Sequence, residues 1–247
     1  MSLLSPDRII GPFRGIVTDF GGDVGLTSDF YPAPHSKGLC VLIPPWKVEA
    51  DFFKLVRKRI YEAGYSCLEY KIASALLSPD YRYTHDAFKE VIDHVRLDID
   101  KMVHQHGYKQ VQVIGISIGC VEAAMIANNN DYVTRLVLVA PGCDLAQSMW
   151  YGLKTQNIRR LFEKQGITLE FLKEAWRDLA PENNFQGLKG KEIEIHLSKY
   201  DVNIPYRFGK RLVEQMIAHG LDPHVHENKY LGHYLTVLNY LWKGKIR

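Results

Sequence analysis

The 247-residue sequence lacks the features of several protein classes. It contains no run of about eighteen apolar residues, so no membrane-spanning helix is expected. Its first ten residues, MSLLSPDRII, hold no basic segment followed by an apolar core, so we expect no signal peptide. The net charge is only +3 and the chain has no long basic run, which argues against a dedicated nucleic-acid-binding protein.

Cysteine is scarce, and its spacing fits none of the common zinc motifs. The four cysteines are Cys40, Cys67, Cys120 and Cys143, and no two of them form a Cys-x-x-Cys pair. Cys40 and Cys67 lie in strand-like apolar runs, where cysteine behaves as a small buried hydrophobe. We therefore expect four free thiols, a reducing and hence cytoplasmic location, and neither a bound metal nor an organic cofactor.

What the sequence does contain is a repeated alternation of strand and helix patterns. Apolar runs and strand-forming residues predict strands at 38–45, 65–72, 110–115, 133–140, 191–198 and 222–228. Helical spacing of apolar residues predicts helices at 49–63, 85–106, 117–129, 205–219 and 233–243. Thr84 is the expected N-cap of the helix 85–106, and Gly107 is expected to end it.

This alternation predicts an α/β fold, with a mostly parallel sheet covered by helices on both faces. Near the start, residues 13–31 predict two strands joined at Gly21-Gly22-Asp23, which is a hairpin signal. Residues 142–189 interrupt the rhythm, because they contain helix-like pieces but no convincing strand. We expect this segment to be a helical lid inserted into a core formed by residues 1–141 and 190–247.

One serine lies between two glycines in the stretch VIGISIGCVEA, residues 113–123. The pentapeptide 115–119 falls where a predicted strand meets a predicted helix, which is the setting of a nucleophile elbow. A side chain at Gly115 or Gly119 would collide with the neighbouring strand and helix. The N-terminus of the helix also favours negative charge beside Ser117. The setting therefore favours a nucleophile over a serine that only helps the chain to turn.

Two residues that a serine nucleophile requires follow in order along the chain. A serine hydroxyl is a poor nucleophile unless a base takes its proton. Asp201 follows the predicted strand 191–198, and His233 follows the predicted strand 222–228. Asp201 could instead serve only to form a turn before Pro205. Asp144, after the strand 133–140, is an alternative acid.

Taken together, the elbow, Asp201 with Pro205, and Gly232-His233 resemble the α/β-hydrolase superfamily, over nearly the whole chain. The resemblance implies an eight-stranded, mostly parallel sheet that starts with an antiparallel hairpin, and a lid after the sixth strand. It implies Ser117 as nucleophile, His233 as general base and then acid, and Asp201 as the partner of the imidazole. The N–H of Ile118 would be one oxyanion donor.

The loop after the third strand departs from the pattern of that superfamily. Many members carry His-Gly where this chain has Pro44-Pro45-Trp46. Proline has no N–H, so the N–H of Trp46 is the candidate second oxyanion donor, and its indole is a candidate wall of the substrate pocket. Trp150 and Tyr151 are further pocket candidates. Many members of the superfamily have an Asp-x-x-Gly-x-Gly stretch where this chain has EYKIASALLSPDYRY. The resemblance therefore does not imply a substrate.

Two other groups suggest different chemistry but have simpler explanations. His224 and His226 share one face of a predicted strand, which would suit a metal. No third ligand is evident from the sequence, and a partly exposed strand face explains the pair. Cys120 follows the elbow, but it falls inside the predicted helix, where packing explains it.

The sequence therefore predicts a serine hydrolase that cleaves a carboxylic ester or thioester through an acyl-enzyme. Its partner would be a small, partly hydrophobic acyl ester or thioester. The same triad would serve an acyltransferase or a C–C or peptide bond hydrolase. A non-catalytic ligand-binding protein on this scaffold is the remaining alternative.

Overall fold

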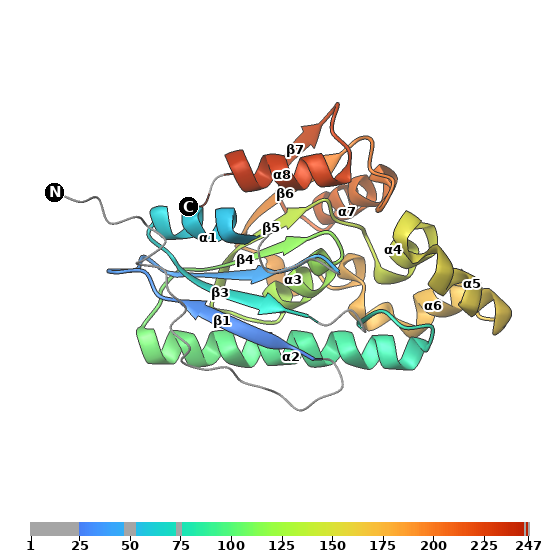
Figure 1. Ribbon diagram of the computed structural model, residues 1–247, viewed down its shortest axis with the longest axis horizontal. Helices are drawn as coiled ribbons and strands as arrows, with labels where there is room; N and C mark the ends of the chain where they lie inside the picture. The colour runs from blue at the N-terminus through green and yellow to red at the C-terminus, as the bar shows by residue number, and fades with distance from the viewer. Residues whose placement is uncertain (1–24, 47–52, 73–75, 245, 247) are drawn as a thin grey trace.

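A computed structural model of the chain describes residues 25–46, 53–72, 76–244 and 246. Seven strands form one sheet in the order β1-β3-β2-β4-β5-β6-β7 (Figure 1). Only β1 runs antiparallel to its neighbour, and every other pair is parallel. The strands are β1 (Thr27–Tyr31), β2 (Leu39–Ile43), β3 (Ser66–Lys71), β4 (Val111–Ile116), β5 (Val133–Val139), β6 (Glu192–Ser198) and β7 (His224–Asn228).

Helices cover both faces of the sheet (Figure 1). One face packs against α1 (Lys54–Glu62) and α8 (His233–Lys243). The other packs against α2 (Tyr81–His106), α3 (Gly119–Asn128) and α7 (Tyr206–Ala218). Successive side chains of a strand point to opposite faces, so each central strand contributes to two separate cores.

The strand β2 shows why the central strands are apolar throughout. Leu39, Val41 and Ile43 belong to the core beneath α2 and α3. Cys40 and Leu42 belong to the core beneath α1 and α8. A strand buried on both faces has no position for a solvated side chain, as the continuous apolar run predicted.

Between β5 and β6 the chain is helical. This segment contains α4 (Leu145–Tyr151), α5 (Gln156–Lys164), α6 (Leu169–Ala175) and four 3-10 helices at 153–155, 177–179, 181–183 and 186–188. The helices α4, α5 and α6 extend beyond the carboxyl ends of the parallel strands (Figure 1). Trp176 anchors the segment, because its indole is buried and donates to the carbonyl of Tyr81 at 2.9 Å.

The structure corrects one helix boundary. Thr84 was expected to cap the helix, but α2 begins at Tyr81 and its N-cap is Asp80. The Asp80 carboxylate accepts the N–H of Arg82 at 2.9 Å and a second N–H one residue later. Thr84 is instead buried within the helix, and its hydroxyl donates to the carbonyl of Ser78. Gly107 ends the helix as predicted, with a φ of 68°.

Seven of the eight predicted strands fall within the described residues, and all seven are present. The second strand of the expected hairpin is β1, and its expected partner lies outside the described residues, as does the turn at 21–23. The four cysteines are buried free thiols, as predicted. None of the described helices is both long and apolar enough to cross a membrane.

Candidate active site

The turn between β4 and α3 holds Ser117 in a conformation that side chains rarely adopt. Its φ is +58°, in the left-handed region, and its N–H donates to the carbonyl of Val139 on β5 at 2.8 Å. For a residue other than glycine this conformation costs about 1–2 kcal/mol. Such strain is typical of functional positions, where the surrounding structure enforces it.

The two glycines of the pentapeptide leave no room for a side chain, as predicted. A Cβ at Gly115 would lie 2.5 Å from the Cβ of Ala123 on α3. A Cβ at Gly119 would lie 2.4 Å from the carbonyl oxygen of Pro44, in the loop after β2. Gly115 therefore allows β4 to pack closely against α3, and Gly119 allows the start of α3 to pack closely against the loop that contains Pro44.

Asp201 and His233 form a buried hydrogen-bonded pair. The imidazole Nδ1 of His233 lies 2.6 Å from Oδ2 of Asp201. His233 is the first residue of α8, and Asp201 lies in the loop between β6 and α7. The two residues are 9% exposed or less. This short hydrogen bond and the burial of both side chains fix the orientation of the imidazole ring.

The second oxygen of Asp201 shapes its own loop. Oδ1 accepts the N–H groups of Asn203 and Ile204, at 2.9 and 2.8 Å. The turn-forming role and the role as partner of histidine are thus both present, on different oxygens of one carboxylate. The alternative acid, Asp144, instead caps α4, where Oδ1 accepts the N–H of Gln147. His233 pairs with Asp201 and not with Asp144.

Sheet topology places the three residues at one edge. Ser117, Asp201 and His233 follow β4, β6 and β7, whose carboxyl ends meet at the same edge of a parallel sheet. Cys120 lies on α3, and its buried thiol donates to the carbonyls of Gly115 on β4 and Val139 on β5. Burial raises the pKa of that thiol well above its usual value, and the Asp201 charge adds to the rise. Cys120 is therefore a packing residue, as predicted.

The candidate oxyanion donors lie on two loops of the same edge. Ile118 is the N-cap residue of α3, and its N–H has no acceptor among the residues that the structure describes. Trp46 is half-buried and packs against the core beneath α2 and α3. The loop that continues from Trp46, residues 47–52, lies outside the described residues.

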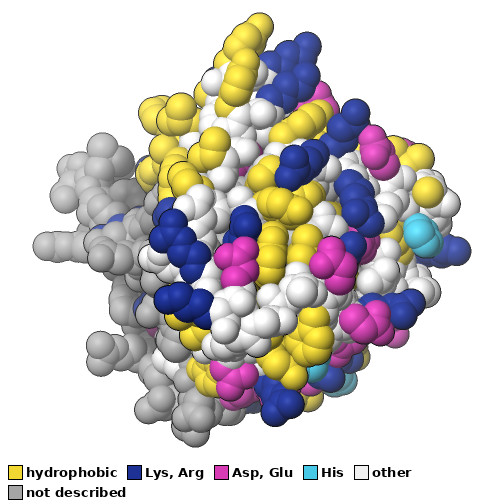
Figure 2. Space-filling view, turned by 90° about the vertical axis from the view of Figure 1, so that its right-hand side faces the viewer, with side chains coloured by type: hydrophobic (Ala, Val, Ile, Leu, Met, Phe, Trp, Pro, Cys, Tyr) yellow, Lys and Arg dark blue, Asp and Glu magenta, His cyan; other side chains and the backbone are white. Residues whose placement is uncertain are grey.

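A mainly apolar hollow of about 360 Å³ opens beside His233. Its walls include Leu153, Val202 and Leu235, with Lys154 as a cationic member. Figure 2 shows this end of the molecule, where hydrophobic side chains lie among Lys, Arg, Asp and Glu side chains. Lys154 was not anticipated from the sequence, since a lone lysine in a helical insertion carries no motif.

Trp150 and Tyr151 line a different hollow, of about 330 Å³, together with residues of α5 and the start of α6. The ring of Tyr151 also packs against Phe208 of α7, at 5.5 Å between ring centres. This hollow and the one beside His233 have no described lining residue in common. Their role as pocket residues stays a prediction.

Glu122 is a buried carboxylic acid that the sequence did not single out. It lies on α3, is fully buried, and neither carboxylate oxygen has a hydrogen-bond partner in the described part of the chain. Burial raises the pKa of Glu122 from 4.5 to about 8. The side chain is therefore neutral in the folded protein at pH 7 and ionised in the unfolded chain.

We expect Glu122→Gln to remove a pH-dependent loss of stability. Between pH 4.5 and 8 the folded protein retains a proton that the unfolded chain releases, so the free energy of unfolding falls as pH rises through this window. The loss is on the order of 3–5 kcal/mol by pH 9. Urea unfolding should give nearly equal free energies of unfolding for the wild type and Glu122→Gln at pH 5. At pH 9 the variant should be the more stable of the two.

The exposed Glu90 of α2 provides the matched control, because Glu90→Gln removes a carboxylate that remains in water. This control should leave the pH profile of the wild type unchanged. If Glu122→Gln follows the same profile as Glu90→Gln, the assignment of a neutral Glu122 is wrong.

Comparison with known proteins reveals the family. The model of the family described as "Serine aminopeptidase, S33" matches residues 34–230. The Pyrococcus furiosus esterase Pf2001 has a TM-score of 0.67 at 15% identity, over 98% of this chain and 91% of that chain. Thermogutta terrifontis esterase 2, phosphonylated by sarin, has a TM-score of 0.63 at 14% identity, over 97% and 95%.

A Pyrococcus horikoshii acylaminoacyl peptidase has a TM-score of 0.65 at 11% identity, over 90% of this chain but only 38% of that chain. No curated protein sequence matches the chain. The family match covers well over half of the chain and includes Ser117 and Asp201, while His233 lies just beyond it. With the seven-stranded sheet and the elbow described above, the chain belongs to the S33 serine aminopeptidase family of α/β-hydrolases.

Proposed function

We propose that the protein is a serine hydrolase that cleaves a carboxylic ester or thioester through an acyl-enzyme. The observation that carries the proposal is the buried Asp201–His233 hydrogen bond at the sheet edge where Ser117 is held with a positive φ. A carboxylate, an imidazole and a strained serine at the carboxyl ends of parallel strands are the parts that acyl transfer requires.

In the first half of the reaction, Nε2 of His233 takes the hydroxyl proton as Ser117 Oγ attacks the carbonyl carbon. The carbonyl π electrons move to oxygen, which becomes the oxyanion of a tetrahedral intermediate. When that intermediate collapses, the bond to the leaving oxygen or sulfur breaks, and His233 returns the proton to the leaving group. Asp201 orients the ring and stabilises its cation through Nδ1.

In the second half, water repeats these steps against the acyl-serine. Nε2 takes a proton from water as the hydroxide attacks, and the bond to Ser117 Oγ breaks with return of that proton to the serine. The N–H of Ile118 supports the oxyanion, and the N–H of Trp46 is the proposed second donor. The segment 142–189 would act as the lid over this edge.

The hollow beside His233 favours an ester over an N-terminal peptide as substrate. An aminopeptidase has to pair the ammonium group of its substrate, because an unpaired buried charge is costly. Among the described residues that line this hollow, none is acidic, and Lys154 is cationic. The apolar walls and this charge suit a neutral or anionic molecule with a medium-sized hydrophobic group.

Peptide hydrolysis is the second candidate, because the family is described as serine aminopeptidases and one structural neighbour is an acylaminoacyl peptidase. An acylated N-terminus carries no ammonium charge, so the chemistry of the hollow opposes it less than a free N-terminus. Acyl transfer to an alcohol or thiol, and C–C cleavage, use the same triad. A non-catalytic binding protein would need neither the pairing of His233 nor the strain at Ser117.

A fluorophosphonate probe tests the proposal directly, because it phosphonylates an activated serine. We expect one adduct per chain, located by peptide mass spectrometry on Ser117, and hydrolysis of p-nitrophenyl esters that stops as the adduct forms. Aminoacyl p-nitroanilides should react far more slowly than these esters. An unlabelled Ser117 would refute the proposal, and p-nitroanilide cleavage faster than ester cleavage would favour the peptidase.

A further inference from the structure

A cluster of two imidazoles and a carboxylate lies on the α8 face of the sheet, between β6 and β7. It arises from strand register: Glu194 pairs with His224, and His196 pairs with His226. Because side chains alternate along a strand, these four positions share one face of the sheet. The sequence showed only the His-x-His half, since the other half depends on which strands are neighbours.

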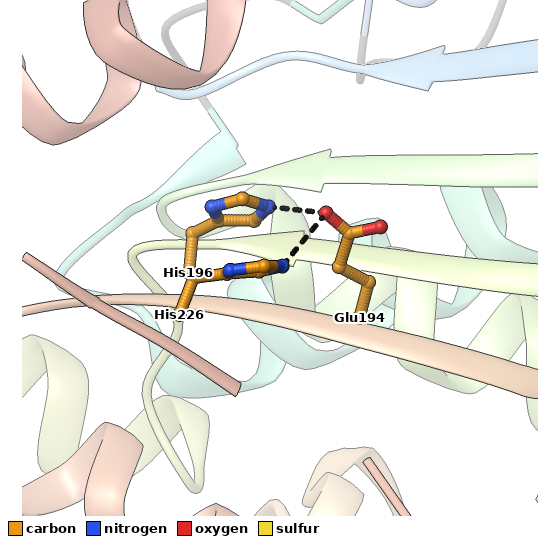
Figure 3. A group of neighbouring side chains, drawn as sticks. All are labelled: Glu194, His196 and His226. Atoms are coloured by element: carbon orange, nitrogen blue, oxygen red, sulfur yellow. Dashed lines mark hydrogen bonds and ion pairs between the residues drawn. The ribbon is translucent and has the colours of Figure 1, made fainter. Parts of the chain in front are cut away.

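The potential ligand atoms of Glu194, His196 and His226 converge. Nε2 of His196 lies 2.7 Å from Oε1 of Glu194, and Nε2 of His226 lies 3.4 Å from the same oxygen (Figure 3). The two imidazole rings are stacked, with centres 4.6 Å apart and planes 19° from parallel. The three ligand atoms all lie within 4.8 Å of one another.

These separations are close to what a zinc ion requires. Zinc bonds of about 2.0–2.1 Å in tetrahedral geometry place ligand atoms about 3.3 Å apart. Side-chain adjustments well under 2 Å would therefore bring the three atoms to bonding distance. Two imidazoles and one carboxylate form a ligand set that suits zinc and neighbouring transition metals, rather than magnesium or calcium.

The surrounding residues hold the carboxylate through Oε2, so that Oε1 faces the two imidazoles. Arg135 pairs with Oε2 of Glu194, on the oxygen opposite to the imidazoles, and also donates to Gln112 on β4 at 2.9 Å. On the other side, the ring of Tyr240 from α8 contacts His196 edge-on, 4.8 Å between centres. Outer contacts of this kind orient metal ligands in known sites.

The cluster is accessible from solvent. A hollow of about 500 Å³ is lined by His196, His224 and His226, with Glu227 and Lys243 at its sides. The side chain of His226 is half exposed, whereas Glu194 and His196 are buried. An ion could therefore enter beside His226 and keep one or two waters. The ring centre of His224 lies 5.8 Å from that of His226, so His224 is a neighbour of the three ligand residues and not one of them.

We propose that Glu194, His196 and His226 form a binding site for a divalent transition-metal ion, zinc being the reference case. The ion would join β6 to β7, the strands that lead into the loops of Asp201 and His233. Its hollow shares no lining residue with the one beside His233, among the described residues, so the ion supports the fold and takes no step in ester cleavage.

The test begins with full-length protein that has been freed of metal by a chelator and then titrated with Zn²⁺. We expect saturable binding of one ion per chain, and a melting temperature raised by roughly 5 °C at about 100 times the dissociation constant. Co²⁺ should give the visible absorption of a tetrahedral site. Mg²⁺ should change neither readout.

His226→Gln is the decisive variant, because the residue is half exposed and its replacement leaves the core intact. It should weaken Zn²⁺ binding by at least about 10–100-fold, because loss of a ligand costs no less than loss of an outer-shell partner. His104→Gln, at an exposed position of α2, is the matched control and should bind as the wild type does. Equal binding by His226→Gln and the wild type, or no saturable binding by the wild type, would overturn the proposal and leave a hydrogen-bonded cluster only.

Discussion

Replacing Ser117 with alanine is expected to lower kcat on p-nitrophenyl esters by a factor on the order of 10⁶. The alanine keeps a Cβ at the position where φ is +58°, so the turn experiences the same backbone strain as before. Only the attacking oxygen is lost. Circular dichroism and the melting temperature should therefore match those of the wild type, while ester hydrolysis falls to the level of the remaining oxyanion donors.

Replacing Ser117 with glycine distinguishes the effect of backbone strain on stability from the effect of the hydroxyl on activity. Ser117→Gly removes both the oxygen and the Cβ, so it should be as inactive as the alanine variant but more stable. We expect a gain of about 0.5–1 kcal/mol in the free energy of unfolding, because the relieved left-handed strain exceeds the entropy that glycine adds to the unfolded chain. Ester hydrolysis by Ser117→Ala at the wild-type rate would show that another group attacks.

The order of strands and helices was predictable from the sequence, because burial on two faces leaves a clear pattern. The continuous apolar run around Val41 needs no tertiary information to be recognised as a strand. The end of α2 was equally clear, since Gly107 adopts the left-handed conformation that glycine favours. Its beginning was not, because Thr84 looks like a cap until its burial is known.

Part of the candidate site was predictable in the same way. Only glycine fits two residues before and two residues after Ser117, because a Cβ at position 115 or 119 would collide with neighbouring atoms. The two glycines are therefore visible in the local sequence. Which strands are neighbours, and in what register they pair, cannot be deduced from the local sequence. The convergence of Glu194 and His226 depends on the register of β6 against β7, which no periodicity reveals. The unpaired carboxyl of Glu122 depends likewise on what surrounds α3.

Asp201→Asn is the second change with a large expected effect, a loss of about 10⁴ in kcat. The carboxylate accepts a hydrogen bond from the N–H at Nδ1 of His233, 2.6 Å away, and so holds the tautomer in which Nε2 is free to act as a base. An asparagine amide that donates to Nδ1 holds the opposite tautomer, in which Nε2 already carries a proton. The loop itself should be retained, because the amide oxygen can still accept the N–H groups of Asn203 and Ile204.

Asp144→Asn is the matched control, since it makes the same chemical change at the other acid considered for this role. Asp144 caps α4 through Oδ1, and asparagine caps a helix about as well as aspartate. Its activity should therefore stay within a few-fold of the wild type. Because Asp201 acts only through His233 and Ser117, Asp201→Asn combined with Ser117→Ala should be no slower than Ser117→Ala alone. If the Asp144 variant instead loses as much activity as the Asp201 variant, the hydrogen bond at His233 does not identify the catalytic acid.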